Sequence, residues 1–221
     1  WIATSSWMTF TGITDDQSQM SDILLDNMRL TLDTLTRDVA SGTASQTTAS
    51  NGSPTATFIN KTDLDTIVTN LLSQNTSPIK SQVNAGTGQG TSPIRSSFIG
   101  ICHVGQRTRL SQVSGFKNVS NYAQTGQIME DEFGATDDIR WLLTTNATRT
   151  DATTGYESLI FGQEFFGTVK ITGNSAAAPL IFTPKDKTGS PLQRYTTLGW
   201  LQNFAAQLLN DNFGHVLVTT V

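Results

Sequence analysis

"ITDDQSQMSDILLDNMRLTLDTLTRDVASG", residues 13–42, contains one long amphipathic pattern. Apolar side chains recur at intervals of three and four residues, which predicts a helix with a single apolar stripe. That stripe consists of Leu24, Met28, Leu32, Leu35 and Val39. Thr or Asp at positions 14–16 can cap the start of the helix, and Gly42 is placed to end it. We therefore expect a helix over 17–39, about 35 Å long at 1.5 Å per residue.

The composition around this helix is neutral and rich in hydroxyl groups. The chain has 221 residues, enough for one domain or two small intertwined ones, and only 14% of them are charged. Thr and Ser number 35 and 20, about a quarter of the sequence. Because uncharged polar groups are easier to bury than charges, this surface favours extensive contact with other proteins.

Charge and cysteine content exclude several classes of protein. A net charge of −4 argues against a DNA-binding module, which normally carries a basic surface. The single cysteine, Cys102, rules out an internal disulfide framework, and no apolar run is long enough for a transmembrane helix. The sequence begins at Trp1 with neither Met nor a signal segment, so we expect residue 1 not to be the start of the gene product.

The rest of the chain indicates an α+β fold, because strands and helices alternate without a regular βαβ rhythm. We expect a second helix over 63–73, capped by Thr62 or Asp63, whose apolar face includes Leu72. The expected strands lie at 1–13, 97–104 (fully buried), 138–145, 158–162, 168–172, 180–183, 194–200 and 215–221. Further helical segments are expected at 105–113, 163–166 (one turn) and 200–211. Mobile loops are expected at 41–57 and 80–93.

Two motifs resemble catalytic or cofactor-binding elements only weakly. "AGTGQGTS", residues 85–92, lacks the Gly-Lys-Ser/Thr ending of a phosphate-binding loop and the spacing of a dinucleotide fingerprint. Cys102 and His103 are neighbours in an expected strand, so their side chains point to opposite faces and cannot act as a nucleophile and its base. His215 has no spacing that links it to either residue. We expect Cys102 to be a buried core residue.

Carboxylates gather in "EDEFGATDD", residues 130–138. This segment lacks the alternating ligands and closing Glu of a calcium-binding loop, so a solvated acidic turn is the favoured interpretation. The alternative is an α+β hydrolase that uses this cluster, with Asp131, Glu132, Asp137 and Asp138 as its acidic groups. From the residues we therefore expect no catalytic, cofactor-binding or metal-binding site outside that alternative.

Five stretches in the same order resemble the major capsid proteins of N4-like tailed bacteriophages, which have the HK97-like fold. They are "TLDTLTRDVASGT" (31–43), "GFKNVSNYAQTGQIMEDEFG" (115–134), "DDIRWLLTTNA" (137–147), "YESLIFGQEFFGTVKI" (156–171) and "PLQRYTTLGWLQNFAAQLLNDNFGHVLV" (191–218). The resemblance departs from the family at His103-Val104-Gly105, where the family often has His-Pro, and at Asp131-Glu132-Phe133-Gly134, where it has Gly-Glu-x-Gly.

The resemblance implies a division into peripheral (P) and axial (A) domains. Residues 1–62 are expected to be P-domain-like with the spine helix at about 17–40, 63–125 A-domain-like, 126–155 a P-domain-like strand region, and 156–221 A-domain-like, returning to the P domain. Little precedes the spine helix, so the family's N-terminal arm and E-loop are expected to be absent or upstream of Trp1.

The function implied is structural rather than enzymatic. Such a protein self-assembles into hexamers and pentamers of an icosahedral head that encloses double-stranded DNA without sequence-specific binding. Its expected partners are identical subunits together with decoration, portal or scaffolding proteins, with no cofactor and no membrane. Its expected location is the virion, after assembly in the host cytoplasm. A third alternative is a binding module of a phage tail or cell surface.

Overall fold

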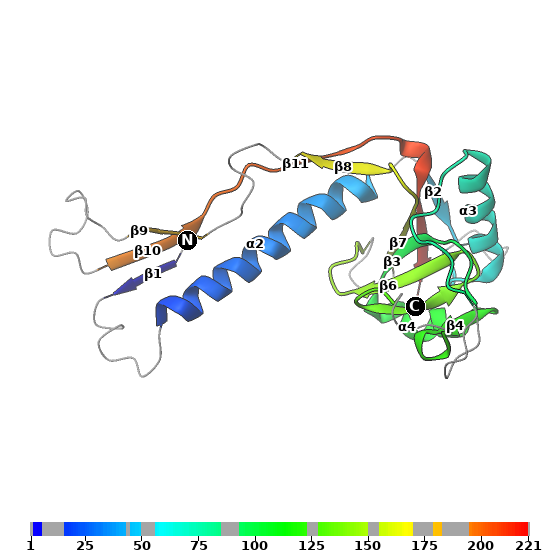
Figure 1. Ribbon diagram of the computed structural model, residues 1–221, viewed down its shortest axis with the longest axis horizontal. Helices are drawn as coiled ribbons and strands as arrows, with labels where there is room; N and C mark the ends of the chain where they lie inside the picture. The colour runs from blue at the N-terminus through cyan, green and yellow to red at the C-terminus, as the bar shows by residue number, and fades with distance from the viewer. Residues whose placement is uncertain are drawn as a thin grey trace. The chain divides into compact units, whose positions relative to one another are not determined.

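The computed structural model describes residues 2–5, 16–42, 45–49, 56–84, 93–122, 128–149, 155–169, 179–182 and 195–220 (Figure 1). The chain forms two compact units, each made of separate stretches of sequence. Unit 1 consists of Trp1–Thr36 and Thr168–Ala206, and unit 2 consists of Arg37–Gly167 and Gln207–Val221. Three segments therefore cross between the units, one of them within a helix.

That helix is α2, Asp16–Ser41, whose first 21 residues belong to unit 1. It confirms the helix expected over 17–39, and its buried side chains Leu24 and Met28 belong to the expected stripe. Leu35, also in that stripe, is 46% exposed. Gly42 follows the last helical residue, and its N–H donates to the carbonyl of Val39 at 3.3 Å. The side chains of the capping candidates at 14–16 lie outside the described residues.

Unit 1 also contains a three-stranded antiparallel sheet in the order β1-β10-β9. Its strands are β1 (Ile2–Ser5), β9 (Pro179–Phe182) and β10 (Tyr195–Trp200), in agreement with the strands expected near residues 1–13, 180–183 and 194–200. Leu198 of β10 is fully buried, and the indole N–H of Trp200 donates to Asn27 Oδ1 at 3.4 Å. The helix and the sheet of unit 1 are therefore joined by a polar contact.

Unit 2 is built on a seven-stranded mixed sheet in the order β2-β12-β7-β3-β6-β5-β4. The strands are β2 (Gln46–Thr48), β3 (Phe98–His103), β4 (Phe116–Asn118), β5 (Glu132–Thr136), β6 (Ile139–Thr144), β7 (Gly155–Phe161) and β12 (Gly214–Thr220). The pairs β3/β6 and β2/β12 are parallel, and the other pairs are antiparallel.

Short helical segments complete unit 2. They are α3 (Lys61–Ser73), η1 (Val104–Gln106), α4 (Arg107–Ser111), η2 (Val119–Asn121) and η4 (Asp211–Phe213). The segment expected at 105–113 is confirmed by η1 and α4. Strands β8 (Phe166–Val169) and β11 (Ala205–Leu208) form a separate two-stranded sheet.

The main core of unit 2 lies between α3 and the sheet. Leu64, Ile67, Val68 and Leu71 of α3 pack with Trp141 and other buried side chains of β3, β6, β7 and β12. The strand expected at 97–104 is β3, in which fully and partly buried side chains alternate, so it is not fully buried as expected. Gly100 of β3 is needed here, because a Cβ would lie 2.7 Å from the Trp141 ring.

The start and the surface of α3 differ from expectation. Asn60, not Thr62 or Asp63, is the N-cap, and its Oδ1 accepts from the Asp63 N–H at 2.8 Å. Asp63 Oδ2 accepts in turn from the Asn60 side-chain amide at 2.6 Å. Leu72, expected on the apolar face, is 54% exposed because it points away from the sheet-facing side of the helix.

The helix expected over 200–211 is wrong. Residues 201–204 are irregular, 205–208 form strand β11, and Asp211–Phe213 form a single 3-10 turn. Exposure alternates from one residue to the next over 201–210, as in an extended chain. Trp200, Phe204 and Leu208 are four residues apart, so they fit a two-residue repeat as well as a helical one. Pairing with β8 decides in favour of the extended form.

Three further expectations need correction. The turn expected to be helical at 163–166 is a tight turn with Glu164 in the left-handed region, at φ 60°, after which Phe166 begins β8. The expected loop at 41–57 contains strand β2, and the expected loop at 80–93 contains the bridges Lys80–Ser97 and Val83–Ile94. Other parts of both loops, including the glycine-rich residues 85–92, lie outside the described residues.

Candidate functional site

Cys102 and His103 do not form a reactive pair. The Cys102 thiol is completely buried, and this burial raises its pKa to about 12. A thiol with such a pKa is protonated at neutral pH and is a poor nucleophile. His103 points to the other face, where its Nδ1 accepts from the Gly105 N–H at 3.0 Å and its ring lies 4.9 Å from that of Tyr156. The expectation that Cys102 is a core residue is confirmed.

His215 is nearly buried in β12, and its Nε2 lies 2.6 Å from Thr47 Oγ1 of β2. Burial lowers the pKa of this imidazole, because the charged form is poorly solvated there. The contact joins two neighbouring strands of the sheet. His215 therefore links β12 to β2 and does not approach Cys102 through any contact that the structure describes.

Glu132 is the centre of a buried polar network between β5 and β6. Its carboxylate pairs with Arg140 through a contact of 2.6 Å, and both side chains are almost completely buried. The Tyr122 hydroxyl and the Met129 N–H also donate to it, at 2.7 and 2.9 Å. Burial and this carboxylate together raise the pKa of Tyr122, because ionisation would place a second negative charge beside the first. All these donors are satisfied, so the network has a structural role.

Asp137 and Asp138 form the turn between β5 and β6 and lie beside an open cavity of about 830 Å³. Asp137 is bound by Lys61 and Asp138 lies 4.0 Å from Arg95, both at the surface. The remaining charged residues of the lining are Asp65 and Lys117. Three cations and three carboxylates thus balance one another around the cavity, and none of them is strongly desolvated.

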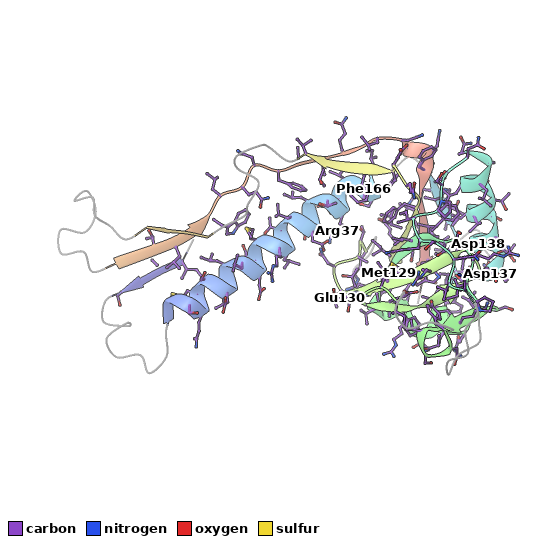
Figure 2. All side chains as sticks on the ribbon, in the orientation of Figure 1. Arg37, Met129, Glu130, Asp137, Asp138 and Phe166 are labelled. Atoms are coloured by element: carbon purple, nitrogen blue, oxygen red, sulfur yellow. The ribbon has the colours of Figure 1, made fainter. Side chains whose placement is uncertain are left out.

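The acidic cluster expected at 130–138 is therefore divided between different environments. Glu132 points into the sheet, whereas Asp137 and Asp138 lie on the exterior; Figure 2 shows Glu130 and Asp137 toward opposite sides of unit 2. Among the residues that the structure describes, no three His, Cys, Asp or Glu side chains are grouped to hold a metal ion. The hydrolase alternative is not favoured, because its proposed carboxylates do not converge.

A surface feature that the sequence patterns missed lies in unit 1. Val169 and residues 202–205 line a shallow pocket of about 320 Å³, and the neighbouring Leu201 is 69% exposed. The signal was present in the sequence as the uncharged run "YTTLGWLQNFAAQLLN", residues 195–210. The helix expected over 200–211 does not predict the alternating exposure that the extended chain shows over 201–210. No helix among the described residues has the length and apolar character needed to cross a membrane.

Comparison with solved structures identifies the architecture. The structure is similar to a chain from Mycobacterium phage Che8, with a TM-score of 0.64 and 9% sequence identity, over 98% of this chain and 68% of that one. It is also similar to the head structure of Helicobacter pylori bacteriophage KHP40, with a TM-score of 0.63 and 11% identity, over 100% of this chain and 74% of that one. This chain has the HK97-like fold.

A third similar structure is an encapsulin complex. In the holo-SrpI encapsulin complex from Synechococcus elongatus, a chain matches with a TM-score of 0.59 and 9% identity, over 98% of this chain and 70% of that one. No protein-family model matches the sequence, and no curated protein matches it. The HK97-like α+β fold expected from the five stretches is therefore confirmed, on the basis of structure.

Proposed function

We propose that this chain is the major capsid protein of a tailed bacteriophage, a structural protein and not an enzyme. It self-assembles into hexamers and pentamers of an icosahedral head around packaged double-stranded DNA. The observation that carries this proposal is the HK97-like fold. The similarity to a bacteriophage head structure extends over the full length of this chain. Large assemblies of this kind sum many weak contacts, so no single interface has to be strong.

The chemistry of the surface supports the proposal. Only 14% of the residues are charged, which limits the cost of removing water when identical subunits meet. The net charge of −4 keeps the protein from binding strongly to the phosphates that it encloses. DNA is accordingly held by confinement, without sequence-specific recognition.

The domain assignment is also part of the proposal. We assign α2 as the spine helix of a P domain, with the sheet of β1, β9 and β10 beside it in the same unit. The seven-stranded sheet of unit 2 corresponds to the A domain. Strand β6, expected in a P-domain-like region at 126–155, is hydrogen-bonded between β3 and β5, so this assignment includes it in the A domain.

The finer points follow from the resemblance in sequence. The lineage is that of N4-like phages, and assembly takes place in the host cytoplasm before the protein becomes part of the virion. Portal, scaffolding and decoration proteins are the partners of the shell. The five stretches within 31–218 support this lineage through their common order.

The experiment is negative-stain electron microscopy of the expressed protein together with its mass in solution. Shells, tubes or six-membered rings are expected over a range of protein and salt concentrations. A population that stays monomeric or dimeric under all these conditions would contradict the proposal. A closed small oligomer without a hexameric lattice would favour the tail or surface binding module.

The likeness to an encapsulin complex supports a second candidate, a shell that encloses protein instead of DNA. Particles isolated from cells that make the chain distinguish the two. A nuclease-resistant genome inside the particles is expected for a phage head. Particles free of DNA that retain one protein cargo would favour the compartment.

A further inference from the structure

Two arginines at the start of α4 have no acidic partner among the residues that the structure describes. The guanidinium groups of Arg107 and Arg109 make no hydrogen bond or ion pair with any of these residues. Other arginines of the described chain do have a carboxylate partner, in the pairs Arg29–Asp26, Arg37–Asp38, Arg95–Asp138 and Arg140–Glu132. Helix α4 therefore carries two positive charges that no described carboxylate offsets.

Each of these two arginines lies over an aromatic ring. The central guanidinium carbon of Arg109 is 3.8 Å from the centre of the Phe58 ring, and that of Arg107 is 5.2 Å from the centre of the Phe133 ring. A guanidinium that stacks on a ring keeps the N–H groups at its edges available for hydrogen bonds. Because stacking restricts the side chain before a ligand arrives, binding costs less conformational entropy. Both side chains are thus prepared to bind an anion.

The start of α4 is held in place by buried hydrogen bonds. Gln106 is completely buried, its side-chain amide donates to the Thr219 hydroxyl of β12, and its Oε1 accepts from the Ser158 hydroxyl of β7 at 3.1 Å. These bonds tie the residue before Arg107 to two strands of the sheet in unit 2. The backbone that carries the two arginines is therefore fixed to the core of its own unit.

A third arginine adds to the positive charge at this place. The central guanidinium carbon of Arg149 is 5.2 Å from the centre of the Tyr156 ring, and that ring lies 4.9 Å from the ring of His103. His103 is the last residue of β3, and η1 and α4 follow it directly. Arg149 and the arginines of α4 are therefore gathered near the same end of β3.

We propose that Arg107 and Arg109 bind backbone phosphates of the enclosed DNA, with Arg149 at the margin of this contact. The edge of a guanidinium matches two oxygens of a phosphate, and DNA carries phosphates at such short and regular intervals that the contact needs no particular sequence. The inference rests on the proposed function, which supplies DNA on one side of every subunit, and it places α4 on that side of unit 2. The net charge of −4 keeps each contact weak, and many subunits add their contacts together.

Binding of the unassembled full chain to a short fluorescent DNA duplex tests the contact. Fluorescence anisotropy gives the association constant at several salt concentrations, and its logarithm falls with the logarithm of the salt concentration by about 0.9 for each phosphate that a cation neutralises. The double variant Arg107→Gln/Arg109→Gln is expected to reduce this slope by about 2, and by the same amount for two duplexes of different sequence. Wild-type chain without salt-dependent binding would overturn the contact.

A second pair of arginines provides the matched control. Arg29→Gln/Arg95→Gln removes the same two positive charges, from exposed side chains that lie beside carboxylates, and is expected to leave the slope almost unchanged. An equal loss in both double variants would show that only the net charge matters, and would overturn the contact. In Arg107→Lys/Arg109→Lys the slope is expected to persist with weaker binding, because lysine keeps the charge without the planar group. Circular dichroism verifies that each variant is folded.

The outcomes separate this inference from the proposed function. Loss of slope in the α4 variant alone supports the contact, and the absence of shells would then overturn only the proposed function. Shells from a chain whose slope is the same in both double variants overturn the contact and leave the proposed function intact. Polyglutamate that displaces the chain as effectively as unlabelled DNA of equal charge would indicate an acidic protein as the partner, and would overturn the assignment to DNA.

Discussion

The buried ion pair between Arg140 and Glu132 makes unit 2 sensitive to a single substitution, because removing one partner leaves the other charge buried and unpaired. Arg140→Met removes the cation while the Glu132 carboxylate stays buried among its remaining donors, Tyr122 and the Met129 N–H. Breaking a buried pair in this way costs about 3–5 kcal/mol. In denaturant unfolding of unit 2, we expect Arg140→Met to lower the free energy of unfolding by that amount. Tyr122→Phe removes only one donor and is expected to lower it less. Equal stability of Arg140→Met and the wild type would contradict the described network.

His215 gives a pH dependence whose sign follows from its burial. The pKa of the folded imidazole is lowered from 6.5, so the unfolded state binds a proton more readily. This contribution to stability is present above pH 6.5 and is lost as the pH falls from 6.5 through the lower folded value. Between pH 7.5 and 5.5, the free energy of unfolding is expected to fall less in His215→Gln than in the wild type. The variant is still expected to lose some stability at the lower pH, because folding also lowers the pKa of His103.

At the scale of elements, the cap of α3 provides a direct comparison between two candidates. Asn60→Ala removes the side chain that accepts from the Asp63 N–H, and such a loss costs about 1 kcal/mol. Thr62→Ala, at the position that the sequence favoured, changes an exposed side chain beyond the cap and is expected to stay within about 0.5 kcal/mol. Equilibrium unfolding of both variants measures the difference, and a larger loss for Thr62→Ala would contradict the described cap.

The elements also show where sequence patterns suffice. For α2 the pattern was sufficient, because apolar residues at intervals of three and four within a helix of 26 residues exclude a strand. Within the strand expected at 138–145, Ile139, Trp141 and Leu143 lie two residues apart, which is the spacing of one face of a strand. In β6 the first two are fully buried and Leu143 packs against the same core. Residues 200–211 failed because four-residue spacing satisfies two periodicities, and only pairing with β8 distinguishes them.

Of the candidate sites, one could be predicted from the sequence and two could not. The opposed directions of Cys102 and His103 followed from strand geometry alone. The separation of Glu132 from Asp137 did not follow from the sequence, because only the pairing of β5 with β6 brings the buried Arg140, eight residues along the chain, to the Glu132 carboxylate. The pocket at 202–205 could not be predicted for the same reason as β11: the sequence indicated a helix where the chain is extended.

At the scale of the whole molecule, the two units differ in the buried apolar side chains of those residues whose burial the structure describes. In unit 1 these are Leu24, Met28 and Leu198, whereas unit 2 has a continuous core of more than ten. We expect amide hydrogen exchange in the unassembled chain to be faster in β10 than in β3, because regions with few buried contacts open at lower free energy. Equal protection of the two strands would contradict this difference. In assembled particles the protection of β10 is expected to rise, with β3 as the internal reference.

The position of β12 has a consequence for the order of events during synthesis. This strand comes after every other strand of its sheet in the sequence, yet it lies inside the sheet, between β2 and β7. A nascent chain on the ribosome therefore cannot close the sheet of unit 2 until residues 214–220 have emerged, and pairing across so long a sequence separation is slow. The sheet of unit 2 is therefore completed only when β12 leaves the ribosome, so the rate of translation sets the earliest time at which this unit can fold.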